Sequence, residues 1–197
     1  MARAITAGTA PGESLRTHLR GATMAAHDLL DHAMQTASGW RTREDYTRFL
    51  ALQHAARAPL EHWLAAHAPA DLAPPVQTGL IARDLARLGM PVPPPAPLFT
   101  IGRPGPGAAL GIAWVLAGSA LGNKAIAKQV ARIGGGAWPT AFLGDDRAMA
   151  FWQDLRARIE RPAAAREAAG ATRAAEAVFA HFLAVAQGAA AAESVPA

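Results

Sequence analysis

The sequence predicts an all-α protein with a single domain. Alanine, leucine and arginine dominate it, whereas β-branched residues, which favour strands, are sparse. Apolar residues recur at spacings of three and four in several windows, and no turn dipeptides separate short alternating runs. The chain has 197 residues, of which 51% are hydrophobic, enough to bury one substantial core.

Six helices are expected. The first follows Ser14 as N-cap and runs to about Met34. The second opens near Arg43, and Pro59 is expected to kink or divide it. The third ends before Gly89, where a helix-terminating glycine precedes proline. The expected ranges are 14–34, 43–64, 76–88, 108–133, 145–159 and 163–187. Residues 1–13 are expected to form a flexible N-terminus, 14–187 the domain, and 188–197 a disordered tail.

Composition excludes several classes of function. The chain has no cysteine, so disulfides, thiolate metal sites and cysteine nucleophiles are excluded. Its 19 basic and 15 acidic residues give a net charge of +4, but the arginines are scattered among acids, which argues against nucleic-acid binding. The first residues contain no continuous apolar stretch, so we expect a cytoplasmic protein without a secretory signal.

One stretch, Pro104 to Gly122, carries no charge and contains a small-xxx-small pair. Prolines and glycines open it, which leaves fewer helical residues than the ~20 needed to cross a bilayer. We therefore expect a buried helix and no membrane association.

His27 is the histidine with the most suggestive surroundings. On a helix with about 100° per residue it lies about 120° from the centre of the expected apolar stripe, at the edge of the buried face. Asp31 follows one turn later on the same flank and Arg20 precedes it by two turns, with Met24 nearby. An acid so placed can orient a metal-ligating imidazole. An ordinary half-buried histidine fits the same spacing, so the pattern alone leaves both interpretations open.

Glycines form a stripe on the fourth expected helix. Gly111, Gly118 and Gly122 lie at spacings of seven and four, and each costs on the order of 1 kcal/mol relative to alanine in a helix interior. The stripe indicates either a closely packed neighbouring helix or a flat ligand against the backbone.

Two segments together resemble one family. SLRTHLRGATMAAHDLLD resembles the proximal-ligand helix of the haem oxygenases, and WVLAGSALGNKAIAKQV resembles their glycine-rich distal helix. Further similarity runs through residues 14–187, and is greatest to the bacterial type that supplies biliverdin to bacteriophytochromes.

The resemblance implies a helical bundle that holds haem b between the proximal and distal helices. His27 would ligate the iron, with Asp31 as its hydrogen-bond partner, and Gly118, Ser119 and Gly122 would form the catalytic distal side. Met24 and Asn123 would contact the haem, while Arg20 and Arg156 would hold its propionates. The reaction would open haem with O2 to biliverdin, CO and Fe²⁺.

Some positions depart from the family pattern. Ser119 stands where many members carry an acid, so proton delivery would depend on Ser119, backbone and water. Asn123 replaces a common glycine, and Ala113 stands where a tyrosine is often found. These departures leave open a haem carrier or sensor without turnover, or a helical module that has lost haem.

The chain has no flavin or Fe–S motif. We therefore expect an external electron donor, either a ferredoxin or a flavin reductase, and a bacteriophytochrome is a possible recipient of the product.

Overall fold

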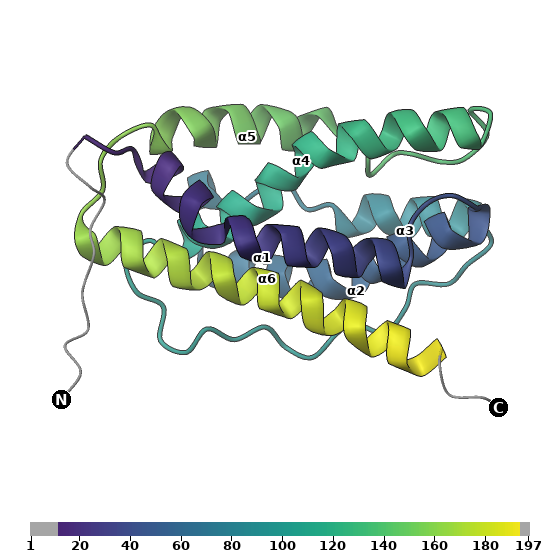
Figure 1. Ribbon diagram of the computed structural model, residues 1–197, viewed down its shortest axis with the longest axis horizontal. Helices are drawn as coiled ribbons and strands as arrows, with labels where there is room; N and C mark the ends of the chain where they lie inside the picture. Colours follow the sequence, from purple (N-terminus) through teal and green to yellow (C-terminus); the bar gives the residue numbers. More distant parts are fainter. Residues whose placement is uncertain (1–11, 194–197) are drawn as a thin grey trace.

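The computed structural model describes residues 12–193, and these form six α-helices and one 3₁₀ turn, with no strand among them. The helices are α1 (Leu15–Ala37), α2 (Arg43–His67), α3 (Thr78–Arg87), α4 (Ala108–Ile133), α5 (Asp146–Ile159) and α6 (Ala165–Glu193), with η1 (Ala70–Leu72) after α2. The all-α prediction is confirmed. Figure 1 shows α1 lying along α6 and α5 on the other side of α1, while α4 packs on both α6 and α5.

Helix α1 begins as predicted, because the side chain of Ser14 accepts a hydrogen bond from the amide of Thr17. The apolar residues spaced by three and four along it include Ala22 and Leu29, which from the sequence alone would be expected to face the core; in the structure both are exposed, whereas Thr23 is buried. Burial of Thr23 is possible because its hydroxyl donates to the carbonyl of Leu19 at 2.8 Å. His18, which helical geometry places on the far side from these apolar residues and thus in solvent, instead has its Nε2 3.2 Å from Oγ1 of Thr172 on α6.

Pro59 does not divide α2, contrary to one of the two expectations. A proline inside a helix leaves the carbonyl four residues earlier without its usual donor. Here the carbonyl of Ala55 accepts the amide of Ala96, 3.1 Å away in the proline-rich loop. The next carbonyl, of Ala56, lies 3.0 Å from Nε2 of His181 on α6. The proline thus frees the carbonyl of Ala55 for the proline-rich loop, and the adjacent carbonyl of Ala56 is a contact for α6.

The other helix ends differ modestly from prediction. Helix α3 starts at Thr78 because the carboxylate of Glu61 on α2 accepts the amides of Gln77 and Thr78. Helix α6 continues to Glu193, so the predicted disordered tail is wrong for residues 188–193. Alanine is the strongest helix former, and Ala189 and Ala190 pack against the core. The predicted flexible segment 1–11 and the tail 194–197 lie outside the described residues.

Helices α4 and α6 pack with their backbones in near contact. A Cβ atom added to Gly111 would lie 2.0 Å from the carbonyl oxygen of Ala171. Gly170 is equally constrained, because its Cβ would lie 1.9 Å from the carbonyl oxygen of Pro106. The glycines therefore allow an approach between the two helices that any side chain would prevent.

By length and composition, α4 and residues Ala165–Ala191 of α6 could cross a membrane. In the fold both contribute to a shared core: Ile112 and Leu116 of α4 pack in one cluster with Val178 and Phe182 of α6. This packing accounts for their apolar sequence.

We expect Gly111→Ala to lower the free energy of unfolding by about 1–3 kcal/mol, because the added methyl group overlaps the α6 backbone. Gly188→Ala is the matched control, since Gly188 is an exposed residue of α6 with no atom near its Cβ position. It should be neutral or stabilising by up to ~1 kcal/mol. Urea denaturation measures both, and equal stability of the two variants would contradict the packing account.

A second prediction concerns pH. Burial lowers the pKa of His181 despite its bond to the carbonyl of Ala56. The unfolded chain then binds a proton more readily than the folded one, so stability should fall as pH drops below about 6.5, the unperturbed value for histidine. His181→Gln keeps a donor for Ala56 and should reduce this slope, as measured by denaturation between pH 5 and 8. An unchanged slope would show that His181 does not contribute to it.

Candidate functional site

Helices α1 and α4 contribute to the same core clusters near both of their ends. Near their beginnings, Leu15 and Leu19 pack in one cluster with Ala113 and Ala117. Near their ends, Met34 and Ala37 share a cluster with Val130, Ile126 and Ala127. Nε1 of Trp40, just after α1, donates to Oε1 of Gln129 at 2.7 Å. The middle segments, 20–33 of α1 and 118–125 of α4, lie between these shared clusters; the two helices have few direct contacts, whereas each packs closely on α6.

Between these ends both helices leave residues exposed. On α1, His27 has 58% of its side chain exposed and Met24 is 48% exposed. On α4, Gly122 is exposed and Leu121 is 55% exposed. Large apolar side chains at an open position are typical of binding surfaces. Several of the predicted proximal and distal residues, among them Met24, His27 and Gly122, thus lie exposed on the stretches of α1 and α4 between the shared clusters.

His27 is oriented by two neighbours. Its Nδ1 lies 3.4 Å from Oδ2 of Asp31 and 3.6 Å from Oδ1 of Asp28. Its ring meets Phe179 of α6 edge to face, with centroids 6.1 Å apart. A carboxylate beside Nδ1 favours the tautomer with hydrogen on that nitrogen, which leaves Nε2 as the free lone pair for a ligand. The predicted pairing of His27 with Asp31 is present in the geometry.

The glycine stripe of α4 divides into two kinds of position. Gly111 is required by the contact with α6, as described above. Gly118 has only ordinary contacts, since its Cβ would lie 3.6 Å from Trp152 of α5, and Gly122 has no atom within 4 Å. Of the two explanations considered from the sequence, helix packing therefore applies to Gly111 and to neither Gly118 nor Gly122.

Ser119 and Asn123 face the packed side of α4. Ser119 Oγ donates to the carbonyl of Leu116 at 2.7 Å and accepts from Nη2 of Arg57 at 2.7 Å. Its hydroxyl hydrogen is therefore already engaged inside the helix. Asn123 is 7% exposed. Ala113, where the family often has tyrosine, is completely buried.

Arg20 and Arg156 are exposed at the end of the α1–α5 pair, near another arginine. Arg16 on α1 and Glu160 at the end of α5 form an ion pair at 2.5 Å. Hydrogen bonds from Arg16 and Ser14 lower the pKa of Glu160, and the charge of Arg156 adds to the effect. Arg20 lies one turn beyond Arg16. Glu160 thus lies near two arginines, Arg16 and Arg156, and the exposed Arg20 adds positive charge on α1 two turns before His27.

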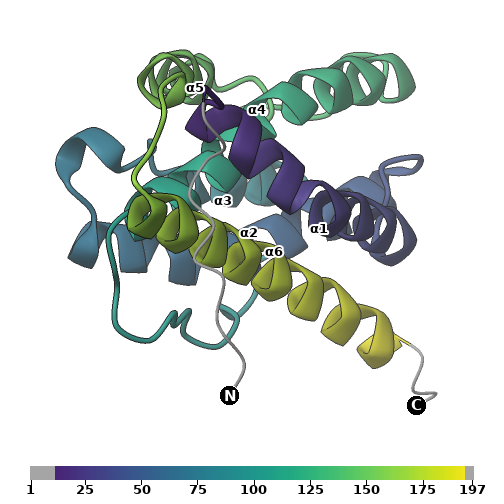
Figure 2. The same cartoon turned by 60° about the vertical axis from the view of Figure 1, so that its left-hand side comes forward.

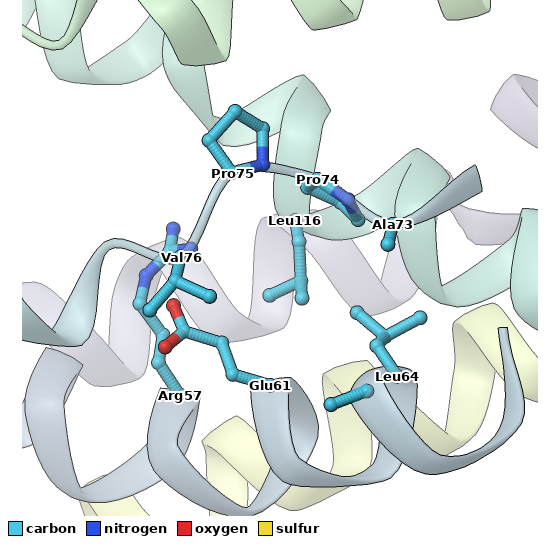
Figure 3. Close-up of a pocket in the computed structure, with 9 residues that line it drawn as sticks. Arg57, Glu61, Leu64, Ala73, Pro74, Pro75, Val76 and Leu116 are labelled. Atoms are coloured by element: carbon cyan, nitrogen blue, oxygen red, sulfur yellow. The ribbon is translucent and has the colours of Figure 1, made fainter. Parts of the chain in front are cut away.

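The enclosed cavity in Figure 3 lies elsewhere, between α2 and residues 73–76. Its volume is about 70 Å³, far below the range of cofactor pockets. Arg57 and Glu61 lie side by side at one end of it (Figure 3). Among residues 12–193, no cluster of three or more metal-binding side chains occurs. A more open hollow of about 320 Å³ lies between the end of α2 and the start of α4, where Trp63 and His67 line it. We take the stretch with His27 and Gly122 as the candidate site because of the residues it exposes.

Sequence reasoning missed three residues of this region: Phe179 against His27, Trp152 beside Gly118, and Arg57 on Ser119. Each lies on a different helix from the residue it contacts, and nothing in its own neighbourhood in the sequence marks it.

The sequence matches no protein-family model and no curated protein. Among solved structures, it is similar to the haem oxygenase of Neisseria meningitidis, described in its NO- and CO-bound forms. The TM-score is 0.65 at 22% sequence identity, and the match covers 90% of this chain and 92% of that chain. The chain therefore has the haem oxygenase fold, as the resemblance implied.

The account of the glycines makes a prediction for the protein without ligand. Gly122→Ala should raise the free energy of unfolding by about 0.5–1 kcal/mol, because alanine is the better helix former and nothing obstructs its methyl group. Thermal or urea unfolding measures the change. A destabilisation like that expected for Gly111→Ala would contradict the open position assigned to Gly122.

Proposed function

We propose that the chain is a haem oxygenase that cleaves haem b to biliverdin, CO and Fe²⁺. The observation that carries the proposal is that a chain with this fold has an exposed histidine beside a carboxylate on α1 and an unobstructed, exposed glycine on α4. Haem is the substrate, and its iron supplies the chemistry that activates O2.

The residues of the site fit a flat apolar ligand with an iron centre. His27 offers Nε2, while Asp31 accepts from or faces Nδ1 and increases the donor strength of the ring. Gly118 and Gly122 allow the ligand to approach the α4 backbone, since a side chain there would occupy its face. Met24 supplies apolar surface from α1.

Charge complements this arrangement. Arg20 on α1 and Arg156 on α5 are exposed and carry positive charge near the N-terminal part of α1. Guanidinium groups pair well with carboxylates, so these two residues are proposed to bind the haem propionates. Asn123, next to Gly122, is proposed to contact the haem or its ligand through its amide.

Proton delivery would differ from that in the family members that carry an acid at the position of Ser119. Ser119 has no acidic group, and its hydroxyl donates a hydrogen bond to the carbonyl of Leu116. Protons would then reach bound oxygen through water ordered by backbone groups near Gly118 and by the remaining acceptor capacity of Ser119. The same observation favours a second candidate, a haem carrier or sensor that binds haem at His27 without efficient turnover.

The reaction needs electrons from outside the chain, and we propose a ferredoxin or a flavin reductase as the donor. We also propose a cytoplasmic location and, from the resemblance to the bacterial type, a bacteriophytochrome as one recipient of biliverdin.

Haem titration tests the site directly. The wild-type protein should give a Soret band that saturates at one haem per chain, and His27→Ala should lower the affinity at least tenfold, because the only proposed iron ligand is lost. His32→Ala is the matched control, since His32 is an exposed histidine on the same helix, and it should bind as the wild type does. Gly122→Ala should weaken haem binding although it stabilises the apoprotein. Equal binding by His27→Ala and His32→Ala would contradict the site.

Addition of reductant and O2 to the haem complex separates the two candidate functions. A haem oxygenase should lose the Soret band and yield the biliverdin spectrum, with release of iron to a ferrous chelator. A stable haem complex with no biliverdin would overturn the enzyme and leave the carrier or sensor.

A further inference from the structure

The strongest unexplained feature of the structure is the burial of Arg57 in the middle of α2. Its exposed fraction is 2%, and the only other buried charged side chain among the described residues is Asp84. The carboxylate of Asp84 accepts the amides of Ala141 and Phe142, so it fixes the loop between α4 and α5. Arg57 fixes no loop, and a buried charge is costly unless it is well hydrogen-bonded.

The hydrogen-bond partners of Arg57 are neutral groups. Nη2 donates to Ser119 Oγ at 2.7 Å and Nε donates to Oε1 of Gln53 at 3.2 Å, while the guanidinium lies 5.1 Å from the centre of the Phe142 ring. The nearby carboxylate of Glu61 is engaged by the start of α3, where it accepts from the amide of Gln77 and the hydroxyl of Thr78. Burial lowers the pKa of Arg57 to about 10, so the group remains charged at neutral pH.

Ser119 connects this charge to the exposed stretch of α4. Its hydroxyl accepts a hydrogen bond from Arg57 and donates one to the carbonyl of Leu116, one turn back in the same helix. Serine bonds of this kind bend helices, and α4 changes direction between its first and second halves in Figures 1 and 2. Gly118, directly before Ser119, has no side chain to hold this turn in place.

We infer that Arg57 is a positioning residue of the haem site, which acts through Ser119 to fix the course of α4 over the haem and to place a positive charge near the exposed glycines. This inference rests on the proposed function. Charge and position are then set by one side chain on α2, which bonds Ser119 about one helical turn before Gly122.

The first test uses the protein without haem. Arg57→Gln and Ser119→Ala should each raise amide hydrogen exchange of residues 117–123 about tenfold, with an unchanged far-ultraviolet circular dichroism spectrum. The double variant should equal the single variants, because the two residues act through one bond. Arg158→Gln is the control, since it removes an exposed arginine that pairs with Asp71. Exchange in Arg57→Gln and Ser119→Ala equal to that in the control would overturn the inference.

If Arg57→Gln fails to fold, Ser119→Ala still tests the inference, because it removes the same hydrogen bond and alanine is well tolerated in a helix.

The second test uses ferrous haem and CO. A positive charge near bound CO lowers its stretching frequency, so Arg57→Gln should raise that frequency and weaken haem binding about tenfold, whereas Arg158→Gln should change neither. An unchanged frequency and affinity in Arg57→Gln would overturn the inference. If the wild-type protein binds no haem, the proposed function fails, while the exchange experiment still decides whether Arg57 holds α4 through Ser119.

Discussion

The close approach of α4 to α6 is the constraint on which the site depends. Gly107, Gly111 and Gly170 let the two backbones meet, and a Cβ on any of them would lie 1.9–2.3 Å from a carbonyl oxygen of the facing chain segment. Because α1 also packs along α6, the position of α4 on α6 sets the spacing between α1 and α4. Both helices pack on α6, which runs beneath them in Figure 2. The distance between His27 and the exposed glycines follows from this packing.

The two sides of the candidate site differ in how they are held. His27 belongs to α1, which is anchored by Leu15 and Leu19 at one end and by Met34 and Ala37 at the other. The glycine side has no side chains of its own and depends on α5 through Trp152 and on α2 through Arg57. A flat ligand placed there would have Nε2 of His27 on the α1 side and the backbone of Gly118 and Gly122 on the α4 side. This asymmetry suits a group that needs one protein ligand and space for a small molecule opposite.

Much of the fold followed from local sequence patterns. The bounds of α4 were predicted correctly, because Gly134 ends a long apolar window, and the N-cap of α1 was correctly identified at Ser14. The course of α2 through Pro59 was not predictable, since the carbonyl of Ala55 that the proline frees is satisfied by the distant amide of Ala96. The end of α6 was missed because the contribution of Ala189 and Ala190 depends on the core they pack against.

The site was predictable where its residues share a helix. His27 and Asp31 are one turn apart, so helical geometry alone placed them together. The glycines could be grouped by spacing, but only the structure separates Gly111, held by α6, from the unobstructed Gly122. Arg57 and Ser119 are 62 positions apart in the sequence, and a buried arginine looks like any other arginine in the sequence.

A crystal structure of the chain with ferric haem tests the central claim most directly. The account predicts Nε2 of His27 as an iron ligand, with the opposite porphyrin face against the backbone of residues 118–122. Haem bound at another histidine, or a side-chain ligand from α4 in place of open space above the iron, would contradict it.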